Sequence, residues 1–185
     1  MSKMSTVIIK KPRREPADKE FSQKDEKIYG VYLKSVLERK VCLDITEIGK
    51  NVKNNLEMKL EQSMGGKCVN EGYVKPKTVK IINYSSGNVN SSKIEFTVTF
   101  DAMICLPVEG MKIECTCKTI TKAGIHAQVI DDNNNIPVTI FIARDHHHLD
   151  SRFSNINVGD KLKSRVIGIR YELDDDFICA ICRFI

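Results

Sequence analysis

The chain has 185 residues, of which 42% are hydrophobic, and carries a net charge of +5 at pH 7. This length suffices for two small domains with packed cores, and no run approaches the roughly 20 apolar residues of a membrane-spanning helix. The apolar run Val7–Ile9 is too short for a secretory signal, and 7 cysteines, an odd number, are atypical of a disulfide framework. We therefore expect an intracellular protein with reduced thiols, located in the nucleus or the cytoplasm.

Positive charge is concentrated in the first half of the chain. Residues 1–106 carry 19 Lys and Arg against 13 Asp and Glu, whereas residues 107–185 carry 10 against 11. Residues 1–27 form a charged leader with little to bury, and we expect a solvated tail there. An arm that becomes ordered on a partner or on nucleic acid is the alternative.

A strand followed by a helix opens the first predicted domain, which spans residues 28–106. Apolar residues over 28–43 indicate the strand, in which a bulge is an open alternative. The helix is expected to begin at Asp44–Glu47, because an acidic cap followed three residues later by Glu is a capping-box pattern. Apolar residues then recur every three or four positions until the glycine pair Gly65-Gly66, which is expected to end the helix. We expect this apolar stripe to pack in a core rather than to bind a cofactor.

Two further strands, predicted over 67–84 and 92–106, complete the first domain. In the second of them, Phe and Val alternate with Thr and Asp, the pattern of a strand that is buried on one face. Pro107 cannot donate a ladder hydrogen bond and Gly110 permits a turn, so a new series of strands is expected beyond them. The first domain is therefore an α+β layer pair of the order strand, helix, strand, strand, with the helix covering one face of an antiparallel sheet.

Residues 107–185 predict an all-β domain with five short strands. Turn signals rich in Gly, Asn and Asp separate them, and the third connection is the longest. Five strands with this spacing are the outline of an OB-type barrel, although other small β barrels share the strand count. The strands are predicted over 111–121, 125–130, 137–143, 161–171 and 177–185.

Six short motifs occur in a fixed order along the chain: Gly66–Cys68, Glu71–Val74, Glu95–Ala102, Pro107–Gly110, Gly124-Ile125 and Ile140–Ile142. This ordered set resembles the seventh-largest subunit of eukaryotic RNA polymerase II and its archaeal counterpart. The similarity runs from about Tyr29 to Arg170, and the rich content of Asn, Lys and Ile suggests a version from a large DNA virus, for which a location in the virion is a further expectation.

This resemblance implies a role as well as a fold. Members of the family have an N-terminal tip domain that docks on the polymerase core and a C-terminal OB domain of the S1 type. With a partner subunit they form a stalk beside the RNA exit path. The implied partners are polymerase core subunits, a second stalk subunit and nascent single-stranded RNA, with no membrane and no cofactor. Gly65, Gly66 and Tyr73 are the implied docking residues.

Candidate RNA-binding residues lie on the second and third strands of the predicted barrel, because OB folds bind nucleic acid there. If the aliphatic residues face the core, His126 and Phe141 face solvent, and Phe141 can stack on a base. A cap on the barrel or a contact with the first domain is the alternative for Phe141. The basic candidates are Lys118, Lys122, Arg144 and a row on the fourth strand, Lys161, Lys163 and Arg165, which solvation alone also explains.

Two clusters invite a metal-site interpretation, and we favour a structural one for both. Cys179 and Cys182 are three residues apart in a predicted strand, so their side chains point to opposite faces. Cys115 and Cys117 share a face and are expected in the core. The run 146–148 contains three consecutive histidines, which rarely converge on one ion. A polar loop between the third and fourth strands is expected instead, in which some of the histidines touch RNA phosphate.

No catalytic motif is present in the sequence: there is no P-loop, no Gly-x-Ser-x-Gly and no dinucleotide fingerprint. We therefore expect a non-catalytic stalk subunit that guides nascent RNA. A free-standing S1-type RNA-binding protein of translation or RNA turnover is one alternative, and an adaptor that binds only proteins is another.

Overall fold

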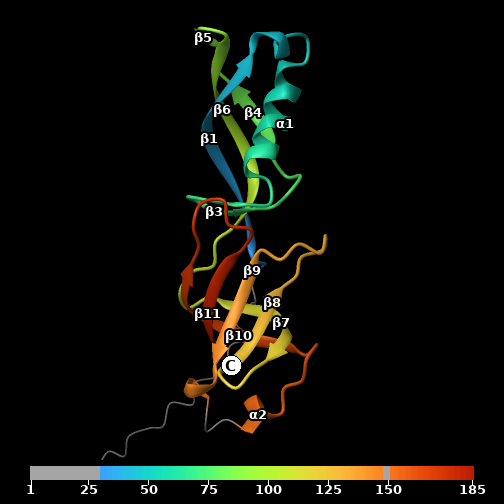
Figure 1. Cartoon of the computed structure of the whole chain (residues 1–185), viewed down its shortest axis with the longest axis vertical. Coiled ribbons are helices and arrows are strands. Elements are labelled where there is room, and N and C mark those ends of the chain that lie inside the picture. Colours follow the sequence, from blue (N-terminus) through green and yellow to red (C-terminus); the bar gives the residue numbers. More distant parts are fainter. Residues whose placement is uncertain (1–29, 148–150) are drawn as a thin grey trace, which may run out of the picture.

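This computed structural model describes residues 30–147 and 151–185. The predicted leader, residues 1–27, and the third histidine of the 146–148 run lie outside these ranges. Figure 1 shows an elongated molecule in which a sheet with one long helix sits end to end with a β barrel. Each part has its own cluster of buried apolar side chains.

The N-terminal sheet is organised around β6 (Lys93–Cys105). β1 (Tyr32–Asp44) pairs with it antiparallel in unbroken register along all of its length, so the bulge left open by the sequence is not present in this pair. On its other edge β6 pairs in turn with β5 (Asn88–Asn90), β4 (Lys80–Tyr84) and β3 (Gly72–Val74), and β3 pairs with β2 (Cys68–Val69). The alternation predicted for β6 is confirmed, because its Phe and Val residues are buried.

The predicted helix is split into two pieces. The capping box forms, with the Asp44 N–H donating to the Glu47 carboxylate at 3.0 Å, but it caps only a short 3-10 helix, η1 (Ile45–Glu47). The long helix α1 begins later and spans Val52–Met64. α1 runs back along the sheet, antiparallel to β1 (Figure 1), so the chain must reverse direction in between, and a turn containing Gly49 does so. The buried stripe on α1 starts at Leu56, as expected of a core face.

The single strand predicted over 67–84 is also wrong. Instead the chain forms the β2–β3 hairpin, a loop, and then β4. Pro76 has no N–H for a ladder, and Lys77 adopts a positive φ of 61°. The Lys77 N–H then donates to the Glu61 carboxylate of α1 at 2.5 Å, which ties the loop to the helix.

The C-terminal part is a closed five-stranded barrel, and every predicted strand of it has a counterpart. The order around the barrel is β10-β11-β9-β8-β7, with β10 pairing back to β7, and β9 and β11 are parallel. This arrangement fits an OB-like barrel. The long third connection contains η2 (Arg144–His146) and α2 (Ser151–Ser154). The strands are β7 (Lys112–Ile120), β8 (Gly124–Val129), β9 (Val138–Ala143), β10 (Lys161–Arg170) and β11 (Ile178–Phe184).

The barrel core extends into the N-terminal sheet. Cys68, Tyr73 and Cys105 belong to the first sheet by strand pairing, yet they are buried in the same cluster as the barrel's interior residues. The barrel-side end of the first sheet is therefore packed by the barrel itself. Across residues 30–147 and 151–185, no helix is long and apolar enough to cross a membrane.

Candidate nucleic-acid interface on the barrel

His126 on β8 and Phe141 on β9 form a directly opposed cross-strand pair on the outside of the barrel. Their ring centroids are 4.9 Å apart and the rings are tilted by 46°. The flanking residues Ile125, Ile140 and Ile142 are fully buried, so the alternation places the two rings on the outer face. His126 is exposed and Phe141 is half-buried, which leaves an aromatic surface that a base can contact.

Lys122 lies in the tight turn that joins β7 to β8. Gly124 follows the turn and lies so close to β9 that a Cβ there would be 2.2 Å from the Ile142 carbonyl oxygen. The Thr121 hydroxyl closes the turn by donating to the Gly124 carbonyl at 2.9 Å. Lys118 lies at a bulge of β7, where the register with β8 shifts, and it is exposed like Lys122. Lys118 therefore precedes the β7 partner of His126, Thr119, and Lys122 is in the turn before β8.

Arg144 is close to the same turn, but much of its side chain is used internally. One guanidinium nitrogen donates to the Thr121 carbonyl at 3.4 Å, and the guanidinium carbon lies 5.7 Å from the centre of the Phe153 ring. Its Nε is buried without a hydrogen-bond partner in the described part of the chain. Arg144 thus connects the turn to α2, and only part of the Arg144 side chain is available to a ligand.

The basic row predicted on the fourth strand lies elsewhere on the barrel. Lys161, Lys163 and Arg165 are exposed on β10, and β11 separates them from Phe141 on β9. The predicted RNA-binding residues therefore form two groups rather than one site.

Arg183, which the sequence analysis missed, lies between the two groups. It is exposed on β11, and its direct cross-strand partner is Arg165. The signal was present in the sequence, because Ile178, Ala180 and Cys182 alternate with outward-facing residues at the end of the chain.

The histidine run does not form a polar loop throughout. His147 is only 6% exposed and stacks on Phe153 with 5.0 Å between ring centroids. Its Nε2 accepts a hydrogen bond from the Phe184 N–H at 3.1 Å. The imidazole fixes the last strand against α2, and the contact of some histidines of this run with RNA phosphate stays a prediction.

The cysteines have the placement expected of strand residues. Cys179 is exposed and Cys182 is buried, so the two point to opposite faces of β11. The Cys115 thiol lies 3.7 Å from the Leu162 carbonyl, and burial raises its pKa to about 11. Among the residues described, no group of three His, Cys, Asp or Glu side chains is arranged to hold a metal ion.

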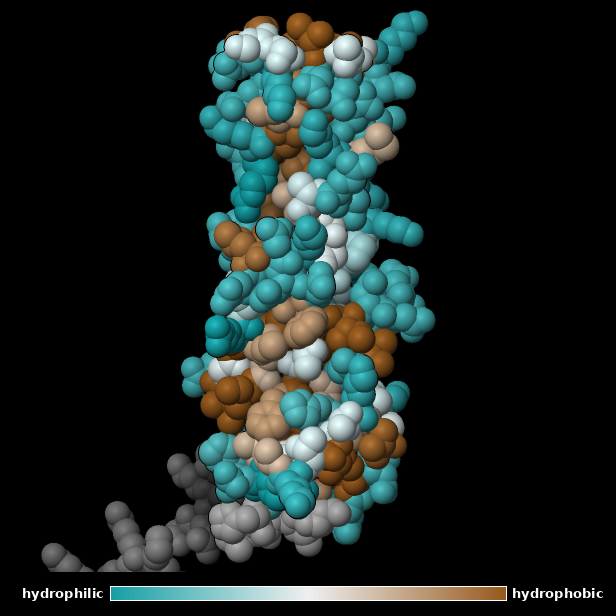
Figure 2. Space-filling view, viewed as in Figure 1, coloured by the Kyte–Doolittle hydropathy of each residue, from teal (hydrophilic) through white to brown (hydrophobic). Residues whose placement is uncertain are grey.

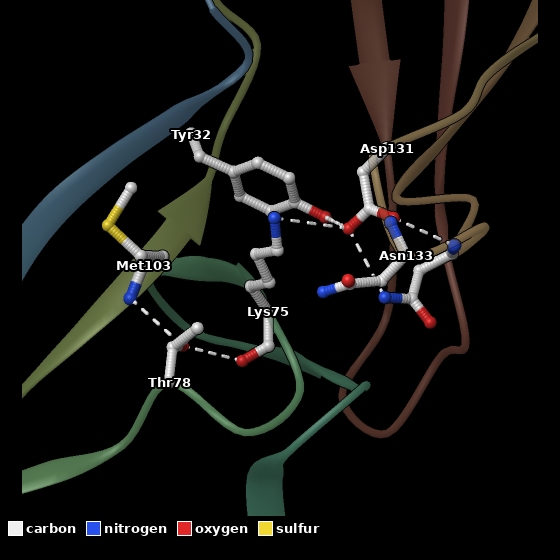
Figure 3. Close-up of polar contacts among 7 residues, drawn as sticks. Tyr32, Lys75, Thr78, Met103, Asp131 and Asn133 are labelled. Carbon is white, nitrogen blue, oxygen red and sulfur yellow. Dashed lines mark hydrogen bonds and ion pairs between the residues drawn. The ribbon is translucent and has the colours of Figure 1, made fainter.

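A buried polar network joins the barrel to the N-terminal sheet, as Figure 3 shows. The Asp131 carboxylate, in the β8–β9 loop, accepts a hydrogen bond from the Tyr32 hydroxyl at 3.1 Å and forms an ion pair with Lys75 at 3.5 Å. Burial alone would raise the pKa of Asp131, but hydrogen bonds from Asn135, Asn133 and Tyr32 outweigh it and lower the pKa. The Lys75 ammonium also lies 4.8 Å from the centre of the Tyr32 ring.

A second set of contacts also joins the barrel to the N-terminal sheet. The β10–β11 loop hydrogen-bonds to the β2–β3 hairpin, with the Cys68 N–H donating to the Asp175 carbonyl at 2.8 Å. In return the Asp174 N–H donates to the Cys68 carbonyl at 2.9 Å. Two loops of the barrel thus hold the barrel-side end of the first sheet.

The three predicted docking residues all lie near this junction. Gly65-Gly66 is the turn after α1, where Gly66 has a positive φ of 77° and its N–H donates to the Val74 carbonyl at 2.9 Å. The turn is therefore at the barrel-side end of the sheet and not at the far end (Figure 1). Tyr73 is only 3% exposed, and burial raises its pKa to about 12. Its side chain contacts the interior of the protein and offers almost no surface to a partner.

The chain was compared with known proteins. No protein-family model matches it. A protein of Acanthamoeba polyphaga mimivirus, provisionally described as a DNA-directed RNA polymerase subunit, is 28% identical over 166 residues. The matched region covers 84% of this chain and 83% of the mimivirus protein. This similarity supports a place among RNA polymerase subunits.

Proposed function

We propose that this chain is a non-catalytic stalk subunit of a multisubunit DNA-directed RNA polymerase, which docks on the core enzyme and guides nascent RNA. The observation that carries this proposal is the similarity to the viral polymerase subunit, which extends over 84% of the chain and so must include most of both the sheet and the barrel. An OB-like barrel with an outward aromatic pair is compatible with the RNA-guiding part of the role. The expected location is intracellular or in a virion.

In this proposal residues 28–106 dock and residues 107–185, an S1-type OB domain, contact RNA. The basic balance of the first 106 residues suits an acidic or mixed surface on the polymerase, with a second stalk subunit as an additional partner. The barrel half has slightly more acidic than basic residues, so RNA binding is expected to be weak, local and tolerant of sequence.

Affinity purification of the tagged full chain tests the docking step. Polymerase core subunits should co-purify in stoichiometric amounts and be identified by mass spectrometry. Replacing Gly65-Gly66 with two valines should reduce their yield, because a Cβ at Gly65 would lie 2.1 Å from the Glu61 carboxylate and Gly66 needs a positive φ. Gly168→Val is the matched control, since a Cβ at Gly168 meets nothing within 4 Å. A folded chain that never recovers polymerase subunits would contradict the proposal.

A protein-only adaptor is the second candidate, and one observation favours it. The outside of β10 and β11 exposes Ile167, Ile169 and Ile181, and the last is 52% exposed. Exposed aliphatic side chains in neighbouring strands are a feature of protein contact surfaces. An adaptor would retain polymerase binding while showing no contact with RNA, and this distinguishes the two candidates.

A further inference from the structure

Three basic side chains lie in one row across neighbouring strands of the barrel. Arg165 on β10 is directly opposite Arg183 on β11, and on its other side it is directly opposite Lys112 on β7. Ile113, Val166 and Cys182 next to them are buried, so the basic side chains occupy the outer face.

The two directly opposed arginines in this row destabilise the fold. Neighbouring strands are about 4.8 Å apart, and like charges that are directly opposite each other destabilise a sheet. Within the part of the chain that the structure describes, Arg165 and Arg183 have no hydrogen bond or ion pair with an acidic side chain. A bound anion would remove the repulsion between the two guanidinium groups. Arginine is also well suited to hold one, because its planar fork donates two parallel hydrogen bonds to a phosphate.

The arginine pair is close to the aromatic pair already described. Phe141 is directly opposite Ile181 on β11, and Arg183 follows two residues later on the same outer face. From the spacing of strands and residues, the Cα atoms of Phe141 and Arg183 are roughly 8 Å apart. Beyond Phe141 on the same face of β9 stands Ala143, whose side chain is small. A nucleotide stacked on Phe141 therefore has its backbone within reach of Arg183.

We propose that Arg165 and Arg183 together form a phosphate-binding site for the backbone of a single-stranded RNA whose base stacks on Phe141. This inference rests on the proposed RNA-guiding function and names its path on the barrel. The RNA crosses from β8 and β9 over β11 to Arg165 on β10, and Arg183 lies between the aromatic pair and Arg165.

Lys163 provides a contrast within the same strand. It is exposed on the same face of β10 as Arg165, but its cross-strand partner on β7 is Glu114. An opposite charge at this position partly neutralises the lysine and stabilises the sheet without a ligand. The phosphate site is therefore confined to the arginine pair, and Lys163 is outside it.

Binding of a fluorescently labelled 12-nucleotide oligouridylate to the purified full chain tests this inference. The variants are Arg165→Gln, Arg183→Gln, Lys163→Gln as the matched control, and Phe141→Ala, each checked for a melting temperature that is not below that of the wild type. We expect each arginine variant to weaken binding about three- to tenfold and Lys163→Gln by less than about twofold. The slope of log K against log salt should fall by about 0.7 for each phosphate that the variant no longer binds.

The outcomes separate this inference from the function on which it rests. If oligouridylate binds and Phe141→Ala weakens it while both arginine variants bind like the wild type, the phosphate site is refuted and the RNA-guiding role stands. If the wild-type chain does not bind the oligomer at all, both are refuted. If the arginine variants keep RNA binding but lose polymerase subunits on purification, the pair binds an acidic protein surface, which also refutes the phosphate site.

Discussion

The backbone hydrogen-bonding groups at the edges of the two sheets are paired in different ways. The barrel closes on itself through the β10–β7 pair, so its outer surface consists of side chains. The N-terminal sheet stays open, and among the described strands β1 pairs only with β6. Its barrel-side end is completed by the barrel, in whose core cluster Cys68, Tyr73 and Cys105 are buried. The N-terminal sheet also has a core of its own, a second buried cluster that contains no barrel residue, so the two parts share only this end of the sheet.

The surfaces of the two parts also differ in the polarity of the side chains that they expose. Figure 2 shows hydrophilic residues over most of the N-terminal sheet and hydrophobic residues gathered over the barrel. The face of the sheet opposite α1 carries cross-strand ion pairs, Lys34 with Asp101 at 2.6 Å and Lys40 with Glu95 at 3.0 Å. The barrel instead exposes an arginine pair and an aromatic pair. The side chains proposed to bind RNA thus lie on the barrel and not on the N-terminal sheet.

The largest expected effect tests whether the N-terminal core is independent of the barrel. Phe100 on β6 is fully buried beneath α1, so Phe100→Ala should lower the free energy of unfolding of that sheet by about 4 kcal/mol. Amide hydrogen exchange should show loss of protection on β1 and β6 while β8 and β9 remain protected. Equal loss of protection in both sheets would show that the two parts unfold as one unit, contrary to the comparison.

The next effect concerns the junction. Asp131→Ala removes a carboxylate that pairs with Lys75 and accepts a hydrogen bond from Tyr32, so it should cost about 3 kcal/mol at pH 7, as measured by urea unfolding. Because the pKa of Asp131 is lowered in the fold, its contribution is present above about pH 4, the ordinary value for Asp, and is lost as the pH falls below it. The difference between wild type and variant should therefore shrink in acid. A difference that stays constant down to pH 2 would contradict this account.

A smaller effect is expected within the barrel. His147→Ala removes the stacking on Phe153 and leaves the Phe184 N–H without its acceptor, which should cost about 2 kcal/mol. His146→Ala is the matched control, because His146 is exposed, and it should change stability by less than about 0.5 kcal/mol. Equal melting temperatures for the two variants would argue against a structural role for His147.

The same contrast explains how much of the fold the sequence could predict. Each barrel strand alternates buried and exposed residues between clear turn signals, so local pattern was sufficient there. In the first part, Ile45 and Ile48 continue the apolar spacing of the helix, although a reversal of the chain at Gly49 separates them from α1. The requirement for that reversal comes from tertiary packing and leaves no periodic signal.

The candidate site, too, could be predicted from the sequence only in part. His126 and Phe141 were predicted because two adjacent strands with known alternation define their face. The pairing of Arg165 with Arg183 depends on the register of two strands, and the Tyr32–Asp131 hydrogen bond joins residues 99 positions apart. Neither contact follows from local sequence. Burial of Tyr73 was missed for the same reason, since the barrel supplies the atoms that cover it.

RNA crosslinking in stalled elongation complexes tests the central claim most directly. Complexes assembled with wild-type chain, Phe141→Ala or Lys122→Glu are compared for the yield of nascent transcript crosslinked to this subunit and for the rate of RNA synthesis. If the barrel guides RNA through its aromatic face, both variants should crosslink several-fold less transcript while the rate of synthesis is unchanged. Wild-type crosslinking yields in both variants would contradict the account and favour an adaptor that contacts only proteins.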